Sequence, residues 1–385
     1  MPPHDSTASN NTNKVPGTLN EGVTPGHPIK SATKVIYPFV DLIRFIATIG
    51  IVFIHTEISV GGSDFNTVLH HVKHVEYYLL LRQLFKFSTI CYFLIAGFLL
   101  ADKTIGSNPF TYYMRRLNII AKPYILAFAI FIAALLIYSY ITVKPVIDFQ
   151  YLYNLFKYAM FYTAFWYIPN YLICLLVIVG FYKYVNSLYF GGFLFFVTLG
   201  YTYFNVYSDN YTSSHTTALF GFVFYMWLGV YIKKKDLVSK IKHINMALLG
   251  GILLLIFVLS NLETWYLFNY THTHDSINTL RITNQLYSVT IFIFLIRCCG
   301  KAPNFGIFNP RQETYGIYLY HTFFIFFVIP VLESWITRQF HIGFFSYNIY
   351  KIILITLVNF VFCYFASTAL VKLLLRLKLG YLPQH

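Results

Sequence analysis

Residues 41–57 read DLIRFIATIGIVFIHTE, a nearly unbroken apolar run with Asp41 and Arg44 at one end and His55 and Glu57 at the other. With its flanking residues the run is long enough to cross the hydrocarbon core of a bilayer as a helix. An ionisable side chain inside such a span costs about 2.5–3.5 kcal/mol on insertion scales, so each one is a functional candidate. The stretch therefore predicts a membrane span and a functional site within it.

The composition of the whole chain is also typical of a membrane protein. Of its 385 residues, 57% are hydrophobic and only 11% are charged, which is far from the usual mixture of a soluble domain. The formal net charge of +14 does not indicate a nucleic-acid partner, because the Lys and Arg residues fall between apolar runs and form no single stripe. The five cysteines lie in or beside apolar runs, which favours packing over disulfide formation.

We expect three parts along the chain. Residues 1–34 are rich in Asn, Thr, Ser, Pro and Gly, which predicts a disordered cytoplasmic tail. No short apolar core with a small-residue cleavage site precedes the first span, so we expect that span to be retained. Residues 35–375 are the predicted transmembrane domain, and residues 376–385 are a predicted short cytoplasmic tail.

Ten apolar stretches are long enough, or nearly long enough, to span a membrane. They lie near residues 36–58, 78–100, 117–142, 163–182, 189–207, 216–232, 244–262, 281–299, 314–333 and 347–373. With the N-terminus in the cytoplasm, nineteen of the 28 Lys and Arg residues fall on the cytoplasmic side, eight fall opposite, and Arg44 lies inside the first span. The positive-inside rule therefore predicts an all-α transmembrane bundle of about ten spans with both termini inside.

Arg44 and His55 mark the two ends of one helix face. Their separation of eleven residues corresponds to about 16 Å along a helix and to about three turns, so the side chains share a face without touching. Imidazole can take a proton from a hydroxyl near neutral pH, whereas an inner arginine suits phosphate groups. The pair predicts an anionic donor at the inner end and a hydroxyl acceptor at the outer end. The alternative is structural: a polar interhelical contact for His55 and a snorkelling Arg44.

Three more residues are candidates for the donor side. Arg115 and Arg116, in PFTYYMRRLNIIAKPYI, precede the third span on the predicted cytoplasmic side, where they would clamp an anionic donor or simply anchor the topology. His321, in QETYGIYLYH, lies about two turns beyond Glu313, which predicts a depth of roughly 10 Å from the inner boundary, nearer the donor than the acceptor. The alternative for His321 is a hydrogen-bonded core histidine.

Other motifs carry less weight. His70, His71, His74, His272 and His274 are expected in outer segments, but no ligand motif accompanies them, so we predict no metal site. The sequence has no Gly-rich phosphate loop, no zinc-type cysteine spacing and no nucleophile elbow. A cation- or proton-coupled transporter would need carboxylates deep in several spans, and these spans hold very few.

The order of these motifs resembles acyltransferase family 3 over roughly residues 36–375. Asp41-Leu-Ile-Arg44, followed after ten residues by His55, resembles the family's first-helix signature. CYFLIAGFLL at 91–100 resembles its Phe-rich segment, with Ala96 in place of the usual Ser. YYMRRLNIIAKPY resembles its paired-Arg loop, FWYIPNYL its fourth-span entry, and YGIYLYH its late Tyr/His segment. The Ala96 departure leaves open any hydroxyl role at that turn.

The resemblance implies a multi-pass enzyme of a bacterial plasma membrane that moves an acyl group, expected to be acetyl, from cytoplasmic acyl-CoA to a hydroxyl of a cell-surface or lipid-linked glycan. It implies His55 as the catalytic base or acyl-handling residue, with Arg44, Arg115 and Arg116 on the acyl-CoA side. Together with the residues singled out above, the catalytic candidates are His55, Arg44 and Glu57, and the donor-binding candidates are Arg115, Arg116 and His321. Besides the lipid bilayer, donor and acceptor, a polysaccharide synthase is an expected partner.

Two segments leave a non-enzymatic alternative open. ALFGFVFYMWLGVYI and INTLRITNQLYSVTIFIFLI resemble members from biofilm-polysaccharide loci, described both as exporters of poly-N-acetylglucosamine and as its O-acylating enzymes. Aromatic residues such as Tyr151, Tyr153, Tyr158, Trp166 and Tyr167 would allow stacking on sugars. The alternative function is therefore a polysaccharide exporter or export partner.

Overall fold

The structure is a computed structural model that describes residues 37–56, 69–101, 108–208, 215–271, 275–299, 305–306, 308–341 and 348–377. Regular structure in these residues is entirely helical. The α-helices are α1 (Pro38–His55), α3 (Glu76–Phe85), α4 (Ser88–Leu100), α5 (Pro109–Thr142), α6 (Phe149–Phe161), α7 (Tyr167–Gly180), α8 (Leu188–Thr202), α9 (Val223–Lys234), α10 (Leu237–Ile241), α11 (Met246–Tyr270), α12 (Ile282–Cys298), α13 (Pro310–Phe323), α14 (Ile329–Phe340) and α15 (Ile349–Arg376). Short 3₁₀ or π segments are η1 (Ala164–Trp166), η2 (Tyr182–Tyr184), η3 (Tyr203–Tyr207), η4 (His215–Thr217) and η5 (Phe324–Val328). Residues 1–34 and 378–385 of the predicted tails, and Glu57, lie outside the described residues.

The all-α membrane bundle predicted from the sequence is confirmed, and each of the ten predicted stretches contains helix. Among the described residues, six helical segments are individually long and apolar enough to cross a membrane. They are Pro38–His55, Glu76–Leu100, Pro109–Thr142, Met246–Tyr270, Pro310–Phe340 and Ile349–Arg376. A seventh is formed if the bent pair Phe149–Phe161 and Ala164–Gly180 is one span. The number of about ten spans stays a prediction.

The region between the third and fourth predicted stretches departs most from expectation. There the chain forms α6, which meets the following η1–α7 segment at a bend of 74°. Thr163 stabilises the bend, because its hydroxyl accepts a hydrogen bond from Phe165 N (3.3 Å) and donates one to Ala159 O (2.6 Å). A side-chain partner of this kind compensates for the helical hydrogen bonds lost at a break. The bend brings η1 into the interior of the bundle, where Trp166 is buried.

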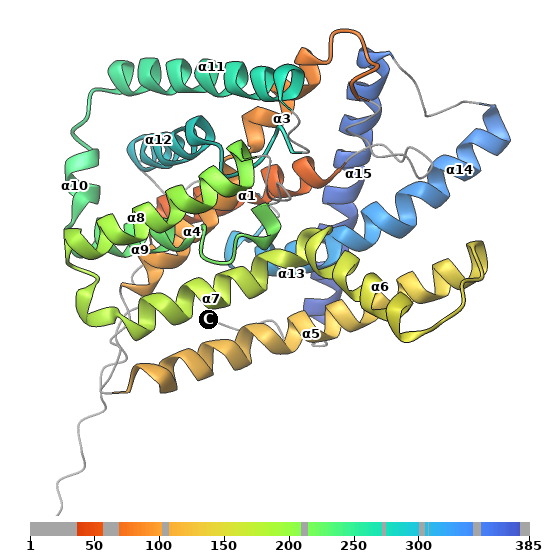
Figure 1. Cartoon of the computed structure of the whole chain (residues 1–385), viewed down its shortest axis with the longest axis horizontal. Helices are drawn as coiled ribbons and strands as arrows, with labels where there is room; N and C mark the ends of the chain where they lie inside the picture. Colours follow the sequence, from red (N-terminus) through yellow and green to blue (C-terminus); the bar gives the residue numbers. More distant parts are fainter. Residues whose placement is uncertain are drawn as a thin grey trace, which may run out of the picture. The chain divides into compact units, whose positions relative to one another are not determined.

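Helix α1 lies at the centre of the bundle. It contacts α3, α4, α12, α13 and α15, and in Figure 1 these helices lie around it. Ile43, Ala47 and Val52 on α1 have no exposed surface. A helix surrounded in this way can present ionisable side chains to the protein interior rather than to lipid, which lowers the cost of placing them inside a membrane.

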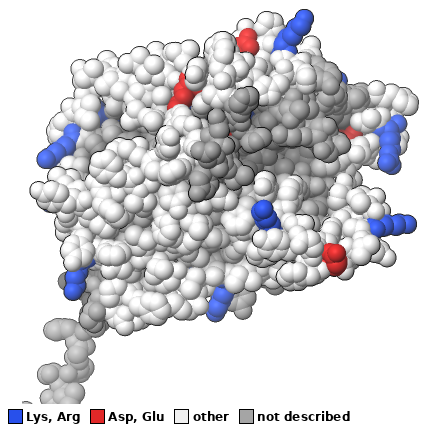
Figure 2. Space-filling model, viewed as in Figure 1, with Lys and Arg blue, Asp and Glu red and all other residues white. Residues whose placement is uncertain are grey.

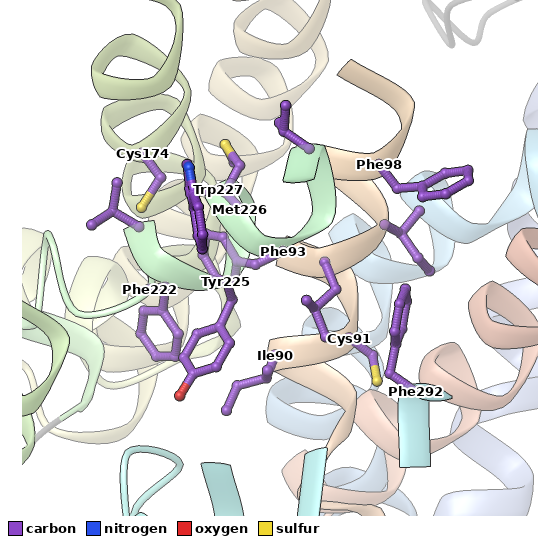
Figure 3. Packing of buried hydrophobic residues seen from close by; sticks show 14 of the residues in the cluster. Ile90, Cys91, Phe93, Phe98, Cys174, Phe222, Tyr225, Met226, Trp227 and Phe292 are labelled. Atoms are coloured by element: carbon purple, nitrogen blue, oxygen red, sulfur yellow. The ribbon is translucent and has the colours of Figure 1, made fainter. Parts of the chain in front are cut away.

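Helices α4 and α9 pack against each other along an extensive contact. A Cβ atom added to Gly229 would lie 2.1 Å from Leu94 O, and one added to Gly97 would lie 1.9 Å from Met226 O. Only glycine permits this approach, which is the usual device for packing helices where apolar side chains gain little by leaving lipid. Figure 3 shows the aromatic side chains around the contact, and Phe93 and Phe222 stack there with ring centroids 4.9 Å apart.

The outer surface of the bundle suits contact with lipid. Apolar side chains on α11 are widely exposed, among them Leu254 (64%) and Leu255 (59%), and α5 exposes Ile125 (61%) and Ile137 (61%). Figure 2 shows one face on which charged side chains are few. Such surfaces exceed the apolar patches that soluble monomers expose and are expected of helices that face hydrocarbon.

Both ends of the helical body lie on the same side. Arg311, at the start of α13, forms an ion pair with Asp41 at the start of α1. Glu313 on α13 pairs with Lys372, in the last turns of α15, at 3.6 Å. The start of α1 and the end of α15 are therefore neighbours, which is the arrangement that the predicted topology requires. That this side faces the cytoplasm stays a prediction.

Candidate active site

Helix α1 carries the two residues on which the sequence argument rests. It is continuous from Pro38 to His55, so Arg44 lies in its second turn and His55 is its last residue. The eleven-residue separation therefore spans about 16 Å of unbroken helix, as predicted. Arg44 and His55 occupy opposite ends of one face, and other side chains fill the interval between them.

At the Arg44 end of α1, called the inner end after the predicted topology, Asp41 binds two arginines. Arg44 Nη1 lies 3.4 Å from Asp41 Oδ1. Arg311 donates from Nε to both carboxylate oxygens, at 3.0 and 2.9 Å, and from Nη2 to Oδ2. In the sequence, Arg311 was only one of the nineteen Lys and Arg residues counted on the cytoplasmic side. The Asn309-Pro310 helix start places Arg311 in the first turn of α13, but only the packing of α13 on α1 brings it to Asp41.

Three hydroxyl groups, those of Thr48, Tyr92 and Thr314, lie one turn further along the same face and are called here the hydroxyl ring. Thr48 donates to Arg44 O (2.6 Å), and its hydroxyl also bonds the Tyr92 hydroxyl (2.7 Å). Thr314 on α13 lies 3.4 Å away from the Thr48 hydroxyl. Tyr92 is one turn before Ala96 on α4. A hydroxyl is therefore present on this side of α4 although Ala96 replaces the serine of the family pattern.

At the outer end, His55 lies beside His321, with ring centroids 5.5 Å apart. The prediction that His321 lies nearer the donor end is wrong, because its ring lies at the His55 end of α1. Helices α1 and α13 run in parallel with Thr48 level with Thr314, and each histidine comes seven residues later. The first turn of α13 already lies level with Arg44, so counting depth from the start of α13 underestimated it.

Hydrogen bonding defines the tautomer of His321. Its Nδ1 lies 3.1 Å from Ile317 O, and because a carbonyl oxygen only accepts, Nδ1 carries the proton. Nε2 is buried and has no hydrogen-bond partner among the described residues. A buried imidazole without a partner for a second proton is neutral, so Nε2 presents a lone pair. His321 is fully buried beside His55.

Basic side chains of α3 also lie at the outer end. Arg82 is 8% exposed and donates from Nη2 to Ile54 O at 2.8 Å. Lys86, one turn later, is 4% exposed, and both charges act on the His55 ring. The sequence interpretation counted both as outer topology charges. The signal in the sequence is that both residues fall within the predicted span 78–100.

A buried polar network holds α3 in this place. Arg281 has no exposed surface and donates to Ser260 O (2.9 Å), to Thr264 and to Gln83 on α3. Gln83 in turn donates to Asn284 Oδ1 (3.0 Å) on α12. Buried polar groups are costly unless paired in this way. The network therefore ties α3 to α11 and α12 and fixes the position of the residues that flank His55.

Arg115 and Arg116 lie on α5, near its start. Both guanidinium groups lie over the Tyr112 ring, at 5.8 and 5.9 Å from its centroid, and Arg116 Nε donates to the Tyr112 hydroxyl at 3.3 Å. Arg115 is exposed and Arg116 is half-buried. Arg116 acts electrostatically on Tyr171 of α7, whereas the charged contacts of Arg44 are with Asp41 and Arg311. The structure thus places the two arginine groups on different helices, α5 and α1.

The outer histidines have individual partners. His70 stacks on Phe268 with centroids 4.0 Å apart, and His74 Nδ1 lies 3.2 Å from Glu76. His272 and His274 fall outside the described residues. In the part of the chain that the structure describes, no three His, Cys, Asp or Glu side chains are placed to hold a metal ion together.

Comparison with known families decides the class of the protein. A family model described as an acyltransferase domain, that of acyltransferase family 3, matches residues 37–376. The chain belongs to acyltransferase family 3. The match runs from the residue before α1 to the end of α15, so the whole helical body is the acyltransferase domain. No curated protein and no solved structure gives a significant match to this acyltransferase.

Proposed function

We propose that this membrane acyltransferase moves an acyl group, expected to be acetyl, from cytoplasmic acyl-CoA to a hydroxyl of a cell-surface or lipid-linked glycan. The observation that carries the proposal is the polar face of α1. That face begins at the Asp41–Arg44–Arg311 cluster, continues through hydroxyl groups and ends at His55, whose ring lies beside the buried His321.

The donor is proposed to bind at the end of the bundle that holds Arg44. Arg44 and Arg311 share one carboxylate, so the cluster keeps a net positive charge suited to the phosphates of coenzyme A. Arg115 and Arg116 remain proposed donor contacts on α5. His321 is reassigned from the donor end to the histidine pair, because its ring lies against His55.

The acyl group is proposed to travel along the hydroxyl ring of Thr48, Tyr92 and Thr314 toward the histidines. Hydroxyl groups both donate and accept hydrogen bonds, so the ring is suited to the amide groups of the pantetheine arm. About 10 Å of helix separates Thr48 from His55. The thioester would then reach the histidine pair while the phosphates stay with the arginines.

In the proposed reaction, His55 keeps a lone pair on one ring nitrogen, with the His321 ring beside it. That nitrogen takes the proton of the acceptor hydroxyl as its oxygen attacks the thioester carbonyl carbon. The C–S bond then breaks, and the departing thiolate takes the proton from His55. Arg82, beside Ile54, supplies positive charge where the carbonyl oxygen becomes negative.

The test is acylation of the surface glycan by variants of the two histidines. His55→Ala should lower transfer by about 10²–10⁴-fold, the usual contribution of a general base, with the protein still inserted. His321→Gln keeps an acceptor atom and should retain more activity than His321→Phe. His70→Ala is the matched control, because His70 stacks on Phe268 outside the site. Full acylation by His55→Ala would contradict the proposal.

The alternative is a polysaccharide exporter or export partner, suggested by the aromatic residues. Trp166 is 4% exposed, and the Tyr151 hydroxyl donates to Ser139 (2.5 Å). Tyr153 and Tyr158 on α6 are exposed, as aromatic residues at a membrane interface also are. If deletion of the protein leaves the polymer fully acylated but trapped inside the cell, the protein is an exporter or export partner. The acyl-transfer proposal then fails. A polysaccharide synthase is the proposed partner in either case.

A further inference from the structure

Another histidine, oriented by a carboxylate, lies at the same end of the bundle as the His55–His321 pair. His215 Nδ1 in η4 lies 3.1 Å from Asp275 Oδ2, and Asp275 lies between α11 and α12. Both side chains are partly buried, at 17% and 25% exposure. The two residues are 60 positions apart in the sequence, so only the packing of the outer segments brings them together.

The charges around this pair set its protonation. Burial by itself raises the pKa of Asp275, but the hydrogen bond from His215 and the charges of Lys86 and Arg82 outweigh burial and lower the pKa to about 2. Burial, followed by Lys86 and Arg82, lowers the pKa of His215, although Asp275 opposes this shift. At neutral pH the pair is thus a carboxylate and a neutral imidazole. The carboxylate accepts Nδ1–H, and Nε2 keeps a lone pair.

Two connections place His215 near the reacting histidines. Lys86 and Arg82 act electrostatically on both His215 and His55. The short segment η1 also contacts His215 and a neighbour of His321. The Trp166 and His215 rings meet edge-to-face, with centroids 5.1 Å apart. Tyr318, whose ring flanks His321, donates to Ala164 O (2.6 Å). His215 itself also acts electrostatically on His55, so His215 and the histidine pair border the same outer region, and η1 contacts both.

We propose that His215 and Asp275 form an acceptor-orienting subsite for a carbohydrate that carries neighbouring hydroxyl groups. His215 Nε2 accepts a hydrogen bond from the hydroxyl adjacent to the one that reacts at His55, and Asp275 holds the ring in the tautomer that this requires. The subsite takes no part in breaking the thioester. It selects which hydroxyl is acylated, and it rests on the proposed function in that His55 is the site of transfer.

Transfer by the purified protein in proteoliposomes, with acetyl-CoA and a short oligomer of N-acetylglucosamine as the probe, tests this subsite. In His215→Phe we expect the KM for the oligomer to rise about three- to tenfold, the usual weight of one neutral hydrogen bond, and the acetylated position to become mixed. The KM for acetyl-CoA should stay unchanged. His215→Gln retains an acceptor atom and should fall between wild type and His215→Phe.

Two further measurements separate the possible failures. Quenching of Trp166 fluorescence by the oligomer, measured with the other three tryptophans of the chain replaced by Phe, reports binding without turnover. It should weaken in His215→Phe and Asp275→Asn. If both variants unfold at the wild-type temperature and keep the wild-type KM, position of acetylation and quenching, the subsite proposal is overturned. If the oligomer binds with the expected dependence on His215 but wild type transfers no acetyl group, the subsite stands and the proposed function fails.

Discussion

The close contact between α4 and α9 gives the sharpest prediction about stability. In Gly229→Ala the new Cβ would start 2.1 Å from Leu94 O, whereas ordinary contact begins at 3.4 Å, so the helices must separate by about 1.3 Å. Forcing extra volume into a packed interior typically costs about 1–3 kcal/mol. The chain has 385 residues. With an unfolding entropy of about 2.1 cal/mol/K per residue, a loss of 1 kcal/mol lowers the midpoint by roughly 1.2 °C, so the unfolding midpoint should fall by roughly 1–4 °C.

The assay is thermal unfolding of the detergent-purified protein, with Gly251→Ala on α11 as the matched control. A Cβ at Gly251 would meet nothing within 4 Å, so this substitution should leave the midpoint unchanged or raise it, because alanine favours helix over glycine. Gly97→Ala should destabilise as Gly229→Ala does. The double variant should lose less than the sum, because one separation relieves both contacts. Equal midpoints for Gly229→Ala and Gly251→Ala would refute this packing.

Three other substitutions probe the buried polar groups. Arg281→Ala should cost about 3–5 kcal/mol of stability, because it leaves several buried partners unsatisfied, and the midpoint of thermal unfolding should fall. Arg311→Ala should raise the KM for acyl-CoA about tenfold with a smaller change in kcat, and Arg311→Lys should recover only part because lysine lacks the fork that binds Asp41. Tyr92→Phe removes the hydroxyl next to Thr48 and should raise the KM for acyl-CoA two- to fivefold, about the weight of one hydrogen bond; an unchanged KM would remove the hydroxyl ring from the donor path.

The sequence predicted those features that depend on spacing within one segment. The shared face of Arg44 and His55 follows from eleven residues on one helix, and the helix-rich fold follows from the length of the apolar runs. Features that join distant segments were not predictable in this way. The level of His321 depends on how far α13 is shifted along α1, and the position of Arg311 depends on the same register.

The outer end of the bundle shows the same limit. Arg82 and Lys86 were counted with the outer charges although both fall within the predicted span 78–100. They are buried because the Arg281 network holds α3 against α11 and α12. His215 and Asp275 flank short polar segments with no motif, so a single sequence gives no signal that they pair. Spacing within one segment predicted the site residues on α1. The positions of the other site residues depend on tertiary packing.

The central claim is that donor and acceptor meet from opposite ends of the α1 face. The most direct measurement uses proteoliposomes of uniform orientation, with labelled acetyl-CoA added only on the side of Arg44 and a glycan acceptor enclosed on the other side. The account predicts that wild type labels the enclosed acceptor and that His55→Ala does not. Labelling that requires acetyl-CoA and acceptor on the same side, or that persists in His55→Ala, would contradict it.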